Sequence, residues 1–110
     1  MKALYNSLPA TIQLMPDGYS IYRFNIVEVE KEGHTTYECD EVIIYGNVTR
    51  EKVTREVINL LWSTDIEQKL LNDFNAFKLG ILDKSYETTY IEFLNDRKYV
   101  KEQIKKDIPE

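Results

Sequence analysis

The stretch YSIYRFNIVEVEKEGHTTYECDEVIIY, residues 19–45, decides the fold. It contains two runs of β-branched and aromatic residues, which are favoured in strands, on either side of the turn sequence KEGH. We therefore expect strands over residues 19–30 and 35–45 that form an antiparallel hairpin. Pairing Glu30 with Thr35 across a four-residue loop is the predicted register, and a slip of one residue would exchange the two faces.

Both faces of this predicted hairpin carry apolar side chains, whereas an antiparallel sheet with one side in water usually alternates cleanly. Aromatic rings are also favoured at protein interfaces. We therefore expect the helix-free face to be covered by a second copy or a partner, through a possible interaction surface drawn from Tyr19, Tyr22, Tyr37 and Tyr45. The register places Tyr22, Phe24, Ile26, Tyr37, Cys39, Ile43 and Tyr45 on one face, and Ile21, Val27, Val29, Val42 and Ile44 among Arg23, Asn25, Glu38 and Asp40 on the other.

Shorter strands precede the hairpin. Residues 11–15, TIQLM, alternate like a short strand, and Pro16-Asp17-Gly18 follows as a turn in which proline fixes φ and glycine supplies a positive φ. Residues near Leu4-Tyr5 can extend the sheet. The N-terminal part is therefore predicted to be an antiparallel β-meander of three or four strands.

Three helices are predicted after Gly46. Thr49 is an N-cap for a helix from about Arg50, and Thr64-Asp65-Ile66-Glu67 matches a capping box that opens a second. Gly80 followed by Ile81 suits a glycine C-cap, and Asp83 can cap a third helix that ends near Lys106. The apolar positions are Val53, Val57, Ile58 and Leu61 in the first helix and Ile66, Leu70, Phe74 and Phe77 in the second. In the third helix a seam recurs at alternating steps of four and three residues and is widened by Leu94; its members are Tyr86, Tyr90, Phe93, Arg97, Val100 and Ile104.

These elements predict an α+β fold in which the meander is followed by three α-helices packed on one face. A chain of 110 residues can bury one core without disulfides or metal. We therefore expect a single α+β domain over residues 1–110, β-rich in 1–48 and helical in 49–110.

Charge and composition narrow the setting. The net charge is −5, and residues 1–48 carry three basic and seven acidic side chains, so no nucleic-acid partner is predicted. No apolar run is long enough for a membrane span, and the first residues lack the apolar core of a signal peptide. A single cysteine agrees with a reducing compartment. A cytoplasmic protein without membrane contact is expected.

Candidate chemistry is sparse. His34 and Cys39 are the only residues of their types, but a turn position and a strand position do not converge as metal ligands must. The acidic neighbours of Cys39 raise a thiol pKa, which disfavours a nucleophile. The carboxylates of residues 28–41 match no calcium loop, and phosphate-loop, dinucleotide and nucleophile-elbow motifs are missing. We therefore predict no catalytic, cofactor-binding or metal-binding residues.

In chain order, MPDGYSIYRFNI, YECDEVIIYG, VTREKVTREVINLLWSTDIEQKLLNDFNAFKLGILDKSY and FLNDRKYVKEQI resemble a group of small uncharacterised proteins encoded in prophages and mobile elements of gut bacteria. The resemblance covers nearly the whole chain, and the helical half is also similar to the helical tails of tail-fibre assembly proteins. The group brings no catalytic residues to this chain. It implies a virion-associated or tail-assembly role.

The sequence thus favours a non-catalytic interaction protein of phage origin that binds a second copy, as a homodimer, or a phage structural or assembly protein. The alternative is a small enzyme or ligand-binding protein with a pocket between sheet and helices. A broad aromatic patch would favour the first reading and a deep polar cavity the second.

Overall fold

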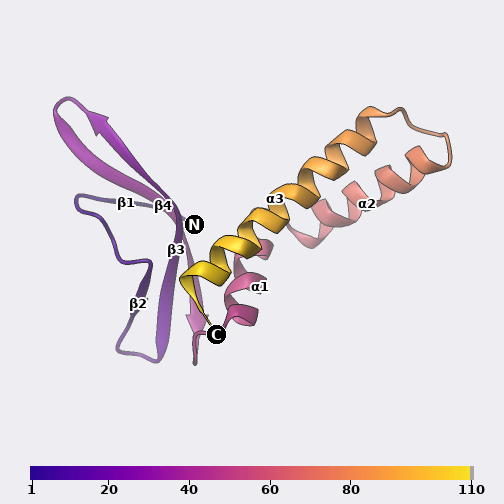
Figure 1. The fold of residues 1–110 in the computed structure, drawn as a ribbon. Coiled ribbons are helices and arrows are strands. Elements are labelled where there is room, and N and C mark those ends of the chain that lie inside the picture. The colour runs from indigo at the N-terminus through magenta and orange to yellow at the C-terminus, as the bar shows by residue number, and fades with distance from the viewer. Residues whose placement is uncertain (110) are drawn as a thin grey trace. The chain divides into compact units, whose positions relative to one another are not determined.

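The computed structural model describes residues 1–109 and shows the predicted α+β fold (Figure 1). The described chain forms two compact units, Met1–Glu56 and a second that begins at Val57. The elements are β1 (Lys2–Tyr5), β2 (Ile12–Leu14), β3 (Tyr19–Lys31), β4 (His34–Tyr45), α1 (Arg50–Leu61), α2 (Thr64–Lys78) and α3 (Ser85–Asp107).

The four strands form one antiparallel sheet in the order β1-β4-β3-β2, so the fourth strand expected near Leu4-Tyr5 is present. Glu30 pairs with Thr35, as predicted. The two-residue loop of Glu32 and Gly33 has positive φ at both positions, which is the geometry that matches the twist of a hairpin. Figure 1 shows β3 and β4 as the long hairpin of this sheet.

A β-bulge in β3 overturns part of the predicted face assignment. Phe24 pairs with Asp40 and Val27 with Glu38, so two residues of β3 lie opposite Cys39 alone. One of these two residues, Asn25, has φ of 53°. Such a bulge adds one residue to one strand and shifts the register beyond it.

The shifted register moves Tyr22 to the other face. Tyr22 pairs with Val42, not with Ile43 as a regular hairpin requires, and it therefore shares a face with Val42 and Ile44. The prediction that Tyr22 and Phe24 lie on the face of Cys39 and Ile43 is wrong for this reason. Tyr22 is 1% exposed and its ring stacks on Phe24 at 6.0 Å between centroids.

The helix ends follow the predicted signals with one correction. Thr49 Oγ1 accepts a hydrogen bond from the backbone N–H of Lys52 at 3.2 Å, which confirms the cap of α1. The cap of α2 is Ser63, not Thr64, because the Ser63 hydroxyl accepts the Ile66 N–H at 3.3 Å. Thr64 is instead the first helical residue.

The turn between α2 and α3 contains the residues predicted to end α2 and to precede α3. Gly80, with φ of 79°, ends α2 in a Schellman motif: its N–H bonds the Phe77 carbonyl, and the Ile81 N–H bonds the Ala76 carbonyl, each at 2.9 Å. Asp83 then accepts the backbone N–H of Ser85 at 2.9 Å. The hydrogen bond from the Ser85 side-chain hydroxyl and, after it, the one from this backbone N–H lower the pKa of the Asp83 carboxyl, because they favour its charged form.

None of the helices in the described part of the chain is at once long enough and apolar enough to cross a membrane.

Candidate functional site

The first unit holds one buried cluster of charged and polar groups. The Arg23 guanidinium is paired with Glu41, Nε to Oε2 at 2.7 Å, and donates from Nη2 to Gln13 Oε1 at 2.7 Å and from Nη1 to the Ala10 carbonyl at 2.9 Å. The Tyr5 hydroxyl donates to Glu41 and accepts from Arg23. Because these partners lie within the fold and satisfy one another, the cluster is a structural network.

Contacts within the Arg23 cluster shift the pKa values of Tyr5 and Arg23. The hydrogen bond to Glu41 raises the pKa of Tyr5, because the phenolic proton is held by the carboxylate. Burial alone lowers the pKa of Arg23, but its hydrogen bonds with Tyr5 and Glu41 reverse this and raise it. Both shifts keep the network in the state with a protonated phenol and a charged guanidinium.

Cys39 and His34 differ in position and in burial. His34 is exposed at the first position of β4, next to the turn, whereas Cys39 is buried and lies opposite the bulge. Burial, followed by the charge of Glu41, raises the pKa of the Cys39 thiol, which agrees with the predicted direction. No three His, Cys, Asp or Glu side chains of the described residues gather in a way that could hold a metal ion.

The four tyrosines named as an interaction surface are divided by the bulge. Tyr22 is buried and does not belong to a surface. Tyr19 and Tyr45 are cross-strand partners with ring centroids 6.3 Å apart, and Tyr45 is 72% exposed. Tyr37 lies on the other side of the bulge, opposite Glu28 and Tyr5, and is half-buried. The structure brings together one pair of the four.

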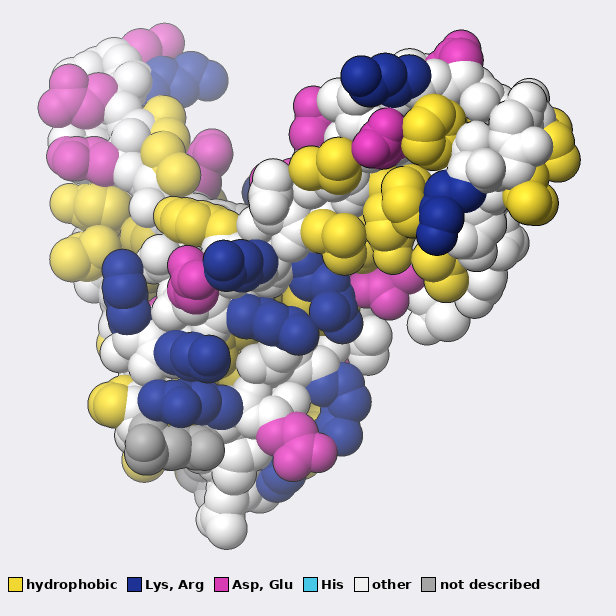
Figure 2. Space-filling view, turned by 45° about the vertical axis from the view of Figure 1, so that its right-hand side comes forward, with side chains coloured by type: hydrophobic (Ala, Val, Ile, Leu, Met, Phe, Trp, Pro, Cys, Tyr) yellow, Lys and Arg dark blue, Asp and Glu magenta, His cyan; other side chains and the backbone are white. Residues whose placement is uncertain are grey.

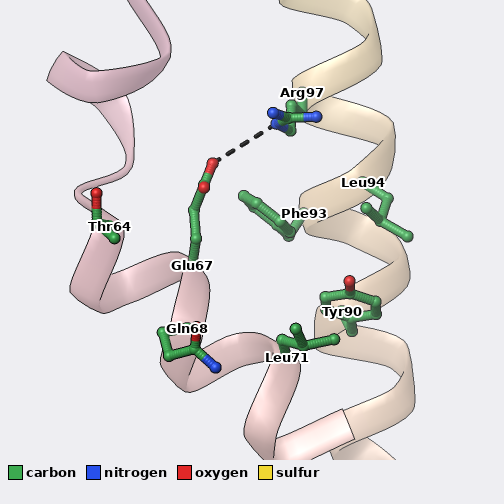
Figure 3. Close-up of a pocket in the computed structure, with 8 residues that line it drawn as sticks. All are labelled: Thr64, Glu67, Gln68, Leu71, Tyr90, Phe93, Leu94 and Arg97. Atoms are coloured by element: carbon green, nitrogen blue, oxygen red, sulfur yellow. Dashed lines mark ion pairs between the residues drawn. The ribbon is translucent and has the colours of Figure 1, made fainter.

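The second unit carries a groove between α2 and α3 (Figure 3). Its open cavity measures about 230 Å³. Each helix contributes four residues at the spacing i, i+3, i+4 and i+7, which lie along one face of a helix. We call this the α2–α3 groove; its lining residues are Thr64, Glu67, Gln68 and Leu71 from α2 and Tyr90, Phe93, Leu94 and Arg97 from α3.

Aromatic rings pack against one another beside this groove, and two of them, Tyr90 and Phe93, also line it. Phe74 of α2 stacks on Tyr90 of α3 at 4.7 Å, and Trp62 meets the edge of Phe93 at 5.4 Å. Tyr90 and Phe93, at 6.0 Å, join the two contacts into one cluster. Aromatic pairs at these separations attract beyond their buried area. The aromatic residues therefore hold α2 and α3 together and leave the groove between them fixed.

One ion pair crosses the groove. Glu67 Oε1 lies 3.5 Å from Arg97 Nε, and Figure 3 shows the two side chains reaching toward each other with Phe93 directed toward α2 beside them. Both atoms are buried, and neither has a hydrogen-bond partner among the described residues. The Arg97 and Glu67 side chains are themselves 36% and 32% exposed, so solvent reaches the rest of each group. The pair therefore has spare hydrogen-bonding capacity at the groove.

Apolar side chains are left exposed around the groove. Leu71 is 39% exposed, Leu94 44% and Ile91 48%, and no residue of α2 is classed as buried. Figure 2 shows hydrophobic side chains gathered over the lobe that α2 and the adjoining part of α3 form. An apolar surface of this kind on a soluble protein usually marks a binding site.

The groove was not predicted from the sequence. Leu94 was recognised only as widening the apolar seam of α3, and Glu67 only as part of a helix cap. The available signal was the matching i, i+3, i+4, i+7 sets of residues 64–71 and 90–97, which could be placed opposite each other once the turn at Gly80 was assigned.

Comparison of the chain with protein-family models, curated proteins and solved structures found no match.

Proposed function

We propose that this chain is a non-catalytic interaction protein whose α2–α3 groove binds a helix of a protein partner. The observation that carries the proposal is the groove lining, in which two antiparallel helices present eight residues with helical spacing and exposed leucines. Amphipathic helices dock into grooves of this kind through residues at i, i+3, i+4 and i+7.

The chemistry of the groove supports a protein helix over a small polar substrate. Leu71, Tyr90, Phe93 and Leu94 offer apolar contact, while Glu67 and Arg97 supply one polar anchor near the start of α2. Binding sites for protein helices combine a long apolar strip with few polar anchors, because the buried apolar area supplies most of the free energy.

The resemblance to prophage-encoded proteins supports a setting for this role. It favours a virion-associated or tail-assembly function, with a phage structural or assembly protein, or a second copy of the chain, as the bound protein. The alternative of a small enzyme or ligand-binding protein with a pocket between sheet and helices stays a prediction.

Site-specific photo-crosslinking in cells of the natural host tests the proposal. A photoreactive residue at Leu71, in the groove, is expected to form a covalent adduct with a protein. The matched control is Lys69, an exposed position on the same helix that is not part of the groove lining. The proposal fails if Leu71 yields no protein adduct, or the same adducts as Lys69.

A further inference from the structure

We infer that the helix that α3 and its groove recognise is α3 of a second copy, paired antiparallel about a two-fold axis. This inference rests on the proposed function and names a second copy as the partner, which would lie along the border of the α2–α3 groove at Leu94. It follows from a row of four side chains on α3, which we call the α3 stripe: Glu87, Ile91, Leu94 and Lys98.

The α3 stripe is a continuous row on the surface of the helix. Its members are spaced by four, three and four residues, so they lie above one another along one side of α3. The row shares Leu94 with the α2–α3 groove and therefore runs along its border. Ile91 and Leu94 are 48% and 44% exposed, and Lys98 is exposed.

The order of charges along the α3 stripe is self-complementary. Glu87 stands at one end, Lys98 at the other, and the two apolar residues lie between them. When two such rows pair antiparallel about a two-fold axis, each Glu87 meets the partner's Lys98 and each Ile91 meets the partner's Leu94. An isologous interface requires this reciprocity, since both copies use the same patch.

A parallel arrangement is disfavoured by the same residues, because it would set Glu87 against Glu87 and Lys98 against Lys98. The next basic positions, Lys84 and Lys101, would face each other in the antiparallel pair, which limits the contact to the turns between them. The helix rises roughly 16 Å over the eleven steps from Glu87 to Lys98. We therefore expect a small interface and a dissociation constant in about the micromolar range.

Charge reversal with mixing is the decisive experiment. The wild-type chain is expected to shift from monomer to dimer between about 1 μM and 1 mM, concentrations that bracket that constant, in sedimentation equilibrium. Glu87→Lys and Lys98→Glu should each raise the dissociation constant by about tenfold or more, since like charges then meet. An equimolar mixture of the two variants should recover the dimer, because residue 87 of each chain then meets an opposite charge at residue 98 of the other.

The mixture separates pairing from folding. Residues 87 and 98 are too far apart on one helix to contact each other, so recovery in the mixture requires two chains. The matched control is Glu92→Lys, the same charge change at an exposed position that points away from the stripe, and it should dimerise like the wild type. Leu94→Glu should abolish the dimer, while circular dichroism shows that its helices persist.

A wild type that stays monomeric at about 1 mM, far above the expected constant, overturns the inference, as does a dimer that Glu87→Lys, Lys98→Glu and Leu94→Glu all leave unchanged. Recovery that fails in the mixture also overturns it. If the wild type is monomeric but Leu71 crosslinks a different protein in the host, the proposed function stands and only the identity of the partner is wrong. If neither result appears, both fail.

Discussion

At the scale of single residues, two ion pairs of equal length show how burial decides the value of a charge. Arg23 and Glu41 are 2.7 Å apart with side chains 3% and 8% exposed, and Lys69 and Asp73 are also 2.7 Å apart but on the helix surface. Water screens the second pair and not the first. The two ion pairs have the same length, but we expect them to contribute differently to the stability of the fold.

Arg23→Met should destabilise the protein by about 3 kcal/mol, because Glu41 would remain buried without its charged partner. Chemical denaturation followed by circular dichroism measures the change. The control is Asp73→Asn, which breaks the surface pair and should leave the denaturation midpoint nearly unchanged. Equal losses in the two variants would show that the Arg23 network is not a buried structural element.

Cys39 should react slowly with iodoacetamide in the folded protein and rapidly after unfolding. The thiol is buried and its pKa is raised, so at neutral pH less of it is thiolate than in an exposed cysteine. The raised pKa also means that unfolding releases a proton above about pH 8.5, so stability should fall as pH rises through that range. Fast alkylation of the folded protein at pH 7 would contradict this account.

At the scale of secondary structure, interactions between neighbouring residues predict where most strands and helices begin and end. Turn residues such as Gly33 and Gly80 and caps such as Thr49 act within a few residues, and the structure places each where the sequence predicts it. The strand bounds and the order of the elements follow for the same reason. Signals of this kind are readable because the interacting groups are neighbours in the chain.

The predictions that were wrong are those that depend on residues distant from each other in the chain. The bulge at Asn25 cannot be read from a strand of good β-formers, since its only local sign is a residue that tolerates positive φ. That one residue exchanged the faces of residues 19–24, buried Tyr22 and aligned Arg23 with Glu41. Of the four tyrosines from which the predicted surface is drawn, Tyr22 is buried for this reason.

The cap of α2 offers a test of a one-residue correction. Ser63→Ala should destabilise α2 by about 1 kcal/mol, because the Ile66 N–H would lose its side-chain acceptor. Thr64→Ala, at the first helical position, should have a much smaller effect. Thermal unfolding followed at 222 nm compares the two variants. A larger loss for Thr64→Ala would restore the capping box predicted from the sequence and reject the assignment of Ser63.

At the scale of the whole molecule, the negative charge is unevenly distributed along the chain. Most of the excess negative charge lies within residues 1–48, whereas the α3 stripe carries one acidic residue at one end and one basic residue at the other, with two apolar side chains between them. Repulsion between net negative copies acts over about 10 Å at moderate salt. Pairing through α3 is compatible with this charge because the contacting row is itself neutral.

If α3 pairs as inferred, the melting temperature of the helical signal should depend on protein concentration. Association that requires folded α3 stabilises it by mass action, and each tenfold rise above the dissociation constant adds about 1.4 kcal/mol per dimer. For a chain of this size that corresponds to a few degrees. Circular dichroism at 222 nm over two decades of concentration measures the shift. Leu94→Glu should melt at one temperature throughout, because it removes the apolar contact at the centre of the stripe. A wild type whose melting temperature does not move over the same range would show that its helices fold without a second copy.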